Sequence, residues 1–258
     1  MQPENLPEDR VIRINDELLL MYKETGLRFG TDAYLLSAMI RGNGRGHAID
    51  LGSGTGVISL LCAAKKRFAS IYAVELQEEY VSIIQRNVSA NHFENIIFPL
   101  HADIRQLRQS DLPHPADVVF TNPPYMRAGS GIPAAAPDNR MARQEICGSI
   151  ADFCLAASRL LKFGGMFYVV YRPERLSDLL YAMRSAGLEP KRLTLVHPTV
   201  SHPPCLLLAE GKKGSGSGMV VTKPLILKTR SSDGTIADTD DYQTIYSTGD
   251  MTELFKGS

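Results

Sequence analysis

The chain has 258 residues and equal numbers of basic and acidic side chains, 28 of each, so its formal charge is zero. Hydrophobic residues make up 44% of the chain and charged residues 22%, a globular composition that excludes a disordered or fibrous protein. No apolar run approaches the roughly 18 residues of a membrane-spanning helix. The start, MQPENLPEDR, lacks the pattern of a secretory signal, and the four cysteines lack the spacing of a metal site. We therefore expect a cytoplasmic protein with reduced thiols, no metal and no membrane partner.

The charge is distributed unevenly along the chain. Residues 127–230 carry 15 basic and 7 acidic side chains, whereas residues 231–258 carry 1 basic and 6 acidic. A basic section can bind a polyanion such as a nucleic acid, and an acidic tail cannot. Solvated helix faces would give the same counts, so the charge alone leaves both interpretations open.

Apolar, β-rich runs alternate with segments of helical periodicity through the first two thirds of the chain. In chain order the pattern predicts a helix at Asp32–Ile40, a strand at His47–Asp50, a helix at Val57–Lys66, a strand at Ile71–Leu76, a helix at Glu78–Asn91, strands at Ile96–Leu100 and Val118–Thr121, a helix at Ser149–Lys162 and a strand at Met166–Tyr171. Uninterrupted apolar strands separated by helices are typical of a parallel sheet covered on both faces. The expected fold class is therefore α/β, with a doubly wound, mostly parallel sheet.

After Ala186 the pattern predicts strands without helices, at Arg192–His197, Cys205–Glu210 and Met219–Leu227. Lys212–Gly218, KKGSGSG, is expected to form a hairpin tip, so the sheet should end in an antiparallel C-terminal hairpin. We expect one domain over residues 1–230, in which residues 1–46 form an N-terminal cap segment. Residues 231–258 are interpreted as a polar, acidic tail whose order the sequence leaves open.

The stretch Asp50–Gly56, DLGSGTG, lies where a predicted strand ends and a helix begins. Glycines at 52, 54 and 56 allow the backbone to turn tightly and to approach a ligand closely. The spacing differs from that of dinucleotide sites and of the P-loop, and no lysine follows, which disfavours nucleoside triphosphates. Asp50 at the strand tip can accept a hydrogen bond from an ammonium group, which suits an amino-acid moiety.

Two more acids follow the next two strands. A carboxylate at Glu75 can accept from both hydroxyls of a ribose, and Asp103 can accept from an adenine amino group. Alone, each would be an ordinary acid at the end of a strand. Because the carboxyl ends of parallel strands meet at one edge of a doubly wound sheet, where such sheets bind ligands, Asp50, Glu75 and Asp103 together predict a binding site there.

The sequence Asn122-Pro123-Pro124-Tyr125 directly follows the strand DVVFT. A planar NH₂ group is a poor nucleophile, because its lone pair is delocalised. If the side-chain carbonyl of Asn122 and the backbone carbonyl of Pro123 accept its two hydrogens, the nitrogen can pyramidalise and direct its lone pair at an electrophile. Pro123 and Pro124 would fix the backbone, and Tyr125 would stack on the conjugated group. These four residues are the predicted catalytic residues.

Taken together, Asp50–Gly56, Glu75, Asp103 and Asn122–Tyr125 resemble the motif set of class I S-adenosylmethionine-dependent methyltransferases with an Asn-Pro-Pro-Tyr motif. The resemblance implies a seven-stranded Rossmann-like methyltransferase sheet and S-adenosyl-L-methionine as cofactor. It implies that Asp50 and the glycine loop hold the methionine end, Glu75 the ribose and Asp103 the adenine. The implied cofactor-binding set in and after the sheet is Asp50, Gly52, Ser53, Gly54, Thr55, Gly56, Glu75, Leu76, Asp103, Ile104 and Asn122.

The stretch Leu27–Ala33, LRFGTDA, resembles the Phe-x-Phe-Gly-Thr-Asp-Ala signature of bacterial tRNA adenine-N6 methyltransferases, which modify the adenine beside the anticodon of a valine tRNA. Leu27 stands where that family has its first Phe. In that family the segment folds over the cofactor, which implies that Arg28, Gly30, Thr31 and Asp32 are cofactor neighbours. From the residues alone, the same stretch reads as the cap of the helix that follows.

These features predict methyl transfer to the exocyclic N6 of an adenine in RNA. The resemblance implies that this RNA is a tRNA and that the adenine lies beside the anticodon. The basic section should hold the RNA through Arg127, Arg140, Arg143, Arg172, Arg175, Lys212 and Lys213, and residues 126–143 should form a mobile loop over the substrate. Three alternatives remain open: methylation of a glutamine amide in a protein such as a release factor, methylation of DNA adenine, and a non-catalytic RNA-binding module. The oligomeric state is left open.

Overall fold

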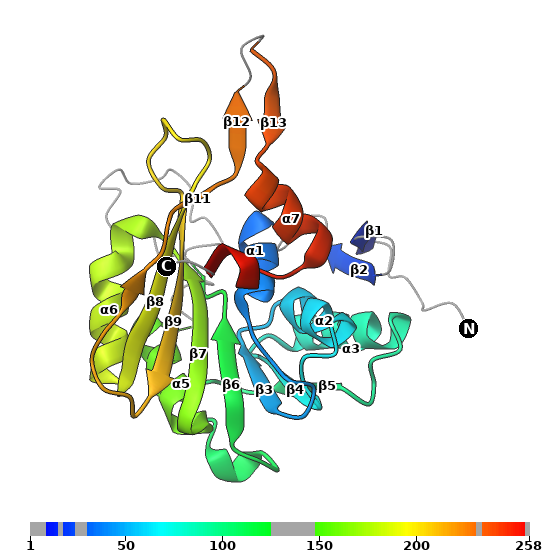
Figure 1. The fold of residues 1–258 in the computed structure, drawn as a ribbon. Helices are drawn as coiled ribbons and strands as arrows, with labels where there is room; N and C mark the ends of the chain where they lie inside the picture. Colours follow the sequence, from blue (N-terminus) through cyan, green and yellow to red (C-terminus); the bar gives the residue numbers. More distant parts are fainter. Residues whose placement is uncertain (1–8, 15–17, 24–29, 125–147, 231–233, 256–258) are drawn as a thin grey trace, which may run out of the picture.

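The computed structural model describes residues 9–14, 18–23, 30–124, 148–230 and 234–255, and in it a mixed sheet forms the centre of the molecule (Figure 1). Seven long strands make up most of this sheet: β3 (His47–Leu51), β4 (Ser70–Glu75), β5 (Ile97–His101), β6 (Ala116–Thr121), β7 (Leu161–Tyr171), β8 (Leu188–His197) and β9 (Leu206–Lys213). Two short strands, β10 (Val220–Val221) and β11 (Leu225–Ile226), extend it beside β8.

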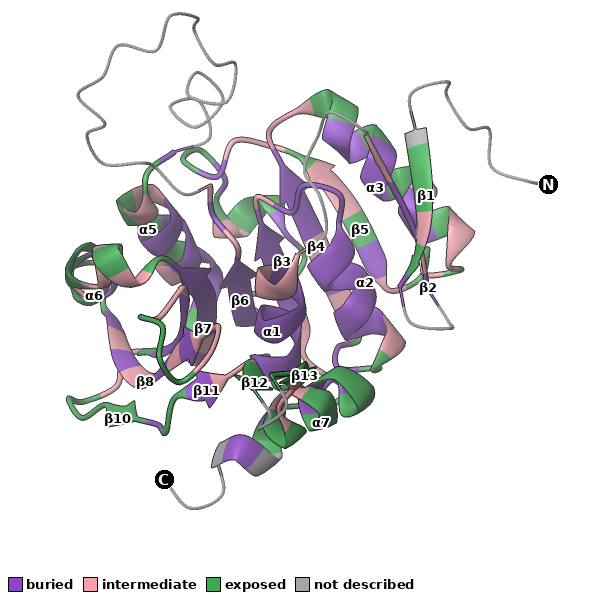
Figure 2. Cartoon of the chain, turned by 90° about the horizontal axis from the view of Figure 1, so that it is seen from above, coloured by how far each residue is buried: buried purple, intermediate pink, exposed green. Residues whose placement is uncertain are grey.

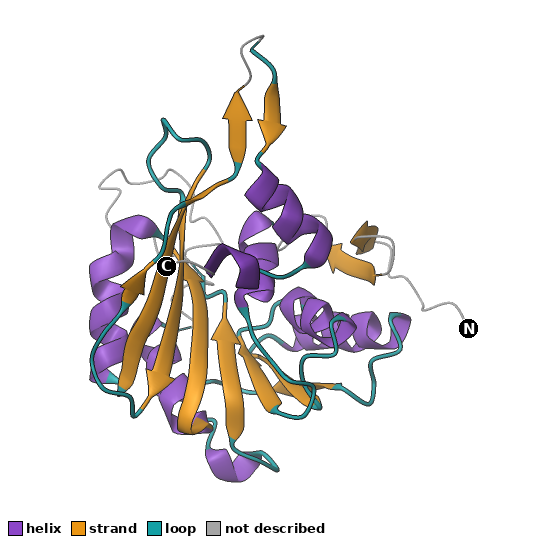
Figure 3. Cartoon of the chain, viewed as in Figure 1, coloured by secondary structure: helices purple, strands orange, loops and turns teal. Residues whose placement is uncertain are grey.

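The strand order is β10-β8-β9-β7-β6-β3-β4-β5, and β11 also pairs with β8. The neighbours from β7 to β5 along this order are parallel. β9 lies antiparallel between β7 and β8, and its arrow is opposite to that of β6 in Figure 3. This arrangement confirms the expected fold class, a doubly wound and mostly parallel sheet of seven long strands with an antiparallel pair at its C-terminal side.

The expected hairpin at Lys212–Gly218 is wrong. After β9 the chain crosses to the far side of β8, where β10 pairs in parallel with Val220 opposite Arg192. Both edges of β9 are already occupied, by β7 and β8, so β10 cannot fold back onto it. Pro224 separates β10 from β11, which explains why one predicted strand is two short ones, because proline cannot donate to a ladder.

Helices cover both faces of the sheet, as Figure 2 shows. One face packs against α1 (Thr31–Met39), α2 (Val57–Ala64) and α3 (Glu78–Ala90) in a cluster that includes Leu35, Ile58 and Ile84. The other packs against α5 (Ile150–Leu160) and α6 (Leu176–Ser185) around Phe153 and Phe167. The helix predictions are correct to within two residues at each end. No helix in the described part of the chain is long and apolar enough to cross a membrane.

The two ends of the described chain add elements that the patterns did not predict. β1 (Asp9–Ile14) and β2 (Leu18–Lys23) form an antiparallel ribbon in the expected cap segment. At the other end, β12 (Lys228–Arg230) and β13 (Ile236–Asp238) form a second ribbon, followed by α7 (Asp240–Thr248) and η3 (Thr252–Phe255). Ile245 and Met251 are buried in the core beside α1, and Met251 N donates to Ala38 O. The boundary at residue 230 stays a prediction, but α7 and η3 of the expected tail pack on the core.

Candidate active site

The glycine loop connects β3 to α2 at the carboxyl edge of the sheet. Gly52, Gly54 and Gly56 all have positive φ, at 68°, 56° and 78°, a conformation that disfavours side chains. A Cβ at Gly56 would also lie 3.1 Å from Ile84 of α3. The backbone N–H groups of Gly52 and Ser53 both donate to Val74 O, at 2.9 and 3.0 Å. The loop is therefore fixed against the end of β4, and a side chain at Gly52 or Gly56 would be strained and would crowd its neighbours.

Asp50 is a buried carboxylate with an unsatisfied oxygen. Its side chain is 1% exposed at the end of β3, and Oδ2 accepts from Ser59 Oγ at 2.7 Å. Oδ1 is buried without a hydrogen-bond partner in the described part of the chain. Burial, with a smaller contribution from the charge of Glu75, raises the pKa of Asp50 to about 7. A buried acceptor in this condition suits a ligand that brings a donor and a positive charge.

Glu75 joins the end of β4 to the glycine loop. Its Oε2 accepts from Gly54 N at 2.9 Å, and its Oε1 accepts from the N–H groups of Leu76 and Gln77 at 2.9 and 3.0 Å. Burial raises the pKa of Glu75, and these backbone hydrogen bonds oppose the rise. Because each carboxylate oxygen can accept two hydrogen bonds, Glu75 can hold the loop and still accept from a ligand hydroxyl.

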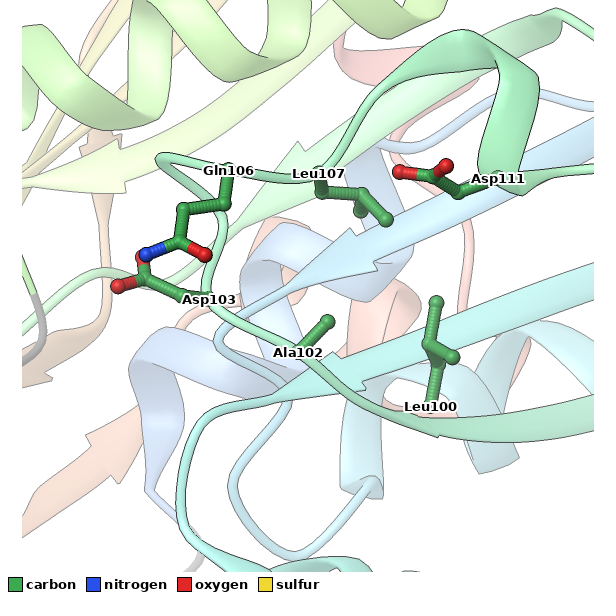
Figure 4. A pocket seen from close by; sticks show the side chains of 6 residues that line it. All are labelled: Leu100, Ala102, Asp103, Gln106, Leu107 and Asp111. Carbon is green, nitrogen blue, oxygen red and sulfur yellow. The ribbon is translucent and has the colours of Figure 1, made fainter.

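Asp103 follows β5 and borders a cavity of about 380 Å³ (Figure 4). The cavity is lined by Leu100, Ala102, Asp103, Gln106, Leu107 and Asp111. The Arg105 guanidinium forms a bidentate pair with Asp103, with Nη2 2.6 Å from Oδ2, and holds the pKa of Asp103 below its usual value. Ile104 is buried beneath this turn. The pair shows that Asp103 already has a strong partner, which the sequence patterns did not indicate.

Asn122 lies beside the glycine loop at the end of β6. β6 pairs with β3, with Phe120 opposite Asp50, and Thr121 Oγ1 donates to Leu51 O at 2.7 Å. The side-chain amide of Asn122 donates from Nδ2 to Asp32 Oδ2 at 3.0 Å. Asp32 stands in the first turn of α1, next to Thr31 and the N-cap residue Gly30. The structure therefore brings the predicted cofactor residues of β3, β4 and α1 to the same edge as Asn122, Pro123 and Pro124.

The predicted RNA contacts fall into three groups. Arg172 and Arg175 follow β7, so they lie at the same edge as Asn122. Lys212 and Lys213 end the antiparallel strand β9, five ladder pairs or about 17 Å away from the Tyr171–Leu207 pair, toward the opposite edge. Lys213 Nζ donates to Leu161 O there. The third group, Arg127, Arg140 and Arg143, lies outside the described residues, as do the predicted cofactor neighbour Arg28 and the predicted catalytic residue Tyr125.

Asn87 of α3 and Asn91, the C-cap residue of that helix, hold β2, and Asn87 also holds the glycine loop, although no motif contains either residue. Asn87 is fully buried; its Oδ1 accepts from Met21 N, and its Nδ2 donates to Met21 O and to Thr55 O in the glycine loop. Asn91, one turn later, makes the same pair of bonds to Leu19 N and O. The two side chains thus extend β2 like a neighbouring strand. Their spacing of four on a buried helix face was the available signal.

The fold and the site define a class I methyltransferase. The chain belongs to the family described as "Methyltransferase small domain", whose model matches residues 21–182. It is 31% identical over 184 residues to a tRNA1(Val) (adenine(37)-N6)-methyltransferase of Histophilus somni, covering 67% of this chain and 77% of that protein. A predicted O-methyltransferase from Agrobacterium tumefaciens superposes with a TM-score of 0.66 at 23% identity, over 85% of this chain and 96% of that one. M. jannaschii TYW2, solved in complex with AdoMet, superposes with a TM-score of 0.54 at 12% identity, over 81% and 87%.

The chain is thus an S-adenosyl-L-methionine-dependent methyltransferase, as expected from the sequence. The residues present fit this cofactor. The unsatisfied Oδ1 of Asp50 suits the ammonium of a methionine moiety, and the adjacent glycine loop admits a ligand close to its backbone. The cavity beside Asp103 lies at the end of β5, two strands from β3 on the same edge of the sheet.

Proposed function

We propose that this protein transfers a methyl group to the exocyclic N6 of an adenine in tRNA. The observation that carries the proposal is the position of Asn122-Pro123-Pro124, at the end of β6 and next to the glycine loop that ends β3. A nucleophile held by the first group would meet a cofactor held by the second.

Three sets of residues would hold the cofactor. Asp50 and the loop Gly52–Gly56 would take the methionine end, Glu75 and Leu76 the ribose, and Asp103 with Ile104 the adenine. When bound, S-adenosyl-L-methionine supplies an electrophilic methyl group, and the electron pair of the broken C–S bond stays on sulfur. The ammonium of the methionine end would donate a charged hydrogen bond to the buried Oδ1 of Asp50.

Asn122 and Pro123 would activate the amino group of the substrate. The Asn122 side-chain carbonyl and the Pro123 backbone carbonyl accept the two N–H hydrogens, which draws the lone pair out of conjugation with the ring. The nitrogen becomes positively charged as the N–C bond forms, and it then loses a proton to solvent. Pro124 keeps this backbone rigid, and Tyr125, outside the described residues, would stack on the base.

The relatives and the charge distribution support an RNA substrate. The Histophilus somni relative is named for adenine 37 of a tRNA, and residues 127–230 of this chain carry 15 basic against 7 acidic side chains. The base must leave its stack to reach Asn122, which is least costly in a single-stranded loop. Arg172 and Arg175, together with Arg127, Arg140 and Arg143, would bind the phosphates around that loop.

The test is transfer of labelled methyl to unmodified tRNA, followed by mass spectrometry of the nucleosides. We expect N6-methyladenosine with the wild-type protein, and formation at least about 100-fold slower with Asn122→Ala. Label recovered only in the glutamine side chain of an added protein would replace this proposal with the amide-methylation alternative. Cofactor binding with no transfer to RNA, DNA or protein would favour a binding module.

A further inference from the structure

We infer that Asp32 is a positioning residue that fixes the orientation of the catalytic amide of Asn122. The inference rests on the proposed function, because it assigns Asp32 a part in the same methyl transfer. It also departs from the cofactor contact that the resemblance implies for Asp32. Its basis is the hydrogen bond from Asn122 Nδ2 to Asp32 Oδ2, 3.0 Å long, which joins residues 90 positions apart in the chain.

A carboxamide has one donating and one accepting end, and it can present either of them after a half turn. Only the orientation with Oδ1 toward the substrate can accept a hydrogen from its amino group. A carboxylate accepts hydrogen bonds and offers none, so Asp32 stabilises the orientation in which Nδ2 faces it. In the flipped orientation, Oδ1 would meet a carboxylate oxygen, and two acceptors would repel each other. The pair therefore selects the orientation that methyl transfer requires.

Asp32 is itself held in place by α1. Its Oδ1 accepts from Ala33 N at 2.9 Å, and it stands in the first turn, where the helix dipole favours a negative charge. Residues 33–39 of α1 are all buried between the sheet and neighbouring elements, so the helix is a rigid support. Within the described part of the chain, Oδ1 thus accepts from α1 and Oδ2 accepts from Asn122.

Gly30 leaves room for this arrangement. Its φ of −129° is extended backbone that any residue adopts, so strain does not require a glycine there. A Cβ on Gly30 would instead lie 2.6 Å from Asp32 Oδ1 and would push the carboxylate aside. This contact gives the Gly-Thr-Asp sequence a geometric reason beyond capping the helix.

The carboxylate also acts on the charge that develops during transfer. As the substrate nitrogen attacks, it becomes positive, and its N–H groups bind more strongly to the acceptors in front of them. An amide whose Nδ2 donates to a carboxylate carries more negative charge on its oxygen, because linked hydrogen bonds polarise one another. Asp32 therefore strengthens the Asn122 carbonyl as an acceptor in the transition state more than in the ground state.

A double-mutant cycle on turnover tests the inference. We expect Asp32→Ala to lower kcat by about 10- to 100-fold, the value of one charge-assisted hydrogen bond, with a Kd for S-adenosylmethionine within about threefold of wild type. In the Asn122→Ala background, Asp32→Ala should cause no further loss, because its effect passes through the missing amide. Asp32→Asn, which keeps an acceptor but loses the charge, should recover part of the lost kcat.

Gly30→Ala offers a second route to the same displacement. It should lower kcat while Asp32 remains present, and its effect should also vanish in the Asn122→Ala background. Asp240→Ala, which removes a first-turn acid from α7 instead of α1, is the matched control and should leave kcat unchanged.

A spectroscopic readout is independent of activity. In protein labelled with ¹⁵N-asparagine, the Asn122 side-chain NH₂ signals, assigned by their loss in Asn122→Ala, should exchange faster with water in Asp32→Ala. Equal exchange, or kcat losses that add in the double variant, or a large rise in cofactor Kd would overturn the inference. If Asn122→Ala itself retains full turnover, the proposed function fails; if only Asp32→Ala retains it, the positioning role alone fails.

Discussion

Burial of the Asp50 carboxyl makes the stability of the fold depend on pH. Its pKa of about 7, against an ordinary value of 3.8, means that the folded protein binds the proton more tightly than the unfolded chain. The fold is therefore most stable below pH 4 with respect to this group. It loses stability as the pH rises from about 4 to about 7, by a total on the order of 4 kcal/mol.

Asp50→Asn should consequently stabilise the cofactor-free protein and impair binding. We expect its free energy of unfolding at pH 8 to exceed that of wild type by about 2 to 4 kcal/mol, with a smaller difference at pH 5. The Kd for S-adenosylmethionine should rise at least about tenfold, because the neutral amide forms no ion pair. Denaturant titrations at the two pH values and calorimetry measure both effects. An unchanged Kd would remove Asp50 from the cofactor site.

Wild-type cofactor affinity should also depend on pH through this group. The ammonium of the methionine end favours the charged carboxylate, so binding releases the proton that Asp50 holds below pH 7. We expect the affinity to fall by up to about tenfold per pH unit as the pH decreases below 7. Calorimetry from pH 5.5 to 8 measures this slope. An affinity independent of pH over that range, with Asp50→Asn as the reference, would show that Asp50 does not meet the ligand.

At the scale of elements, Asn87 connects α3 to two parts of the site. It holds β2, which leads into the segment before α1, and it holds Thr55 of the glycine loop. Asn87→Ala leaves three buried backbone groups without partners, so we expect a loss of about 2 to 4 kcal/mol of stability. The Kd for the cofactor should rise about 3- to 10-fold, because the loop loses a fixed contact.

The control for this variant is Gln85→Ala, an exposed position on the same helix, which should change neither quantity. Chemical denaturation and cofactor titration are the measurements. If Asn87→Ala destabilises the fold but leaves the cofactor affinity unchanged, the asparagine supports the N-terminal ribbon alone and has no part in shaping the loop.

Over the whole molecule, strong periodic patterns predicted the strands and helices that carry the site. The motifs at Asp50–Gly56, Glu75 and Asn122 were placed correctly at one edge, because the carboxyl ends of parallel strands must meet there. What sequence reasoning missed depends on tertiary pairing. Nothing local indicates that β10 crosses β8, or that α7, a helix of mostly polar residues, buries Ile245 in the core. The Asp103–Arg105 pair is the exception, because it joins residues two positions apart.

The orientation of β9 changes where RNA should bind. Lys212 lies toward the opposite edge of the sheet from Asn122, whereas Arg172 follows β7 at the same edge. We expect Arg172→Glu to weaken tRNA binding about tenfold and to reduce the salt slope by about 1. Lys212→Glu should have a clearly smaller effect, and Arg45→Glu, an exposed change before β3, serves as the reference. If the titrations show a larger loss of tRNA affinity for Lys212→Glu than for Arg172→Glu, the RNA does not bind at the edge that carries Asn122.

The central claim is that the Asn122 carbonyl acts on the nucleophile rather than on the cofactor. Single-turnover methyl transfer to a tRNA substrate, measured beside cofactor Kd for wild type and Asn122→Ala, tests it most directly. The account predicts a fall in rate of at least about 100-fold with a Kd within about threefold of wild type. A rise in Kd as large as the fall in rate, or a rate that hardly changes, would contradict it.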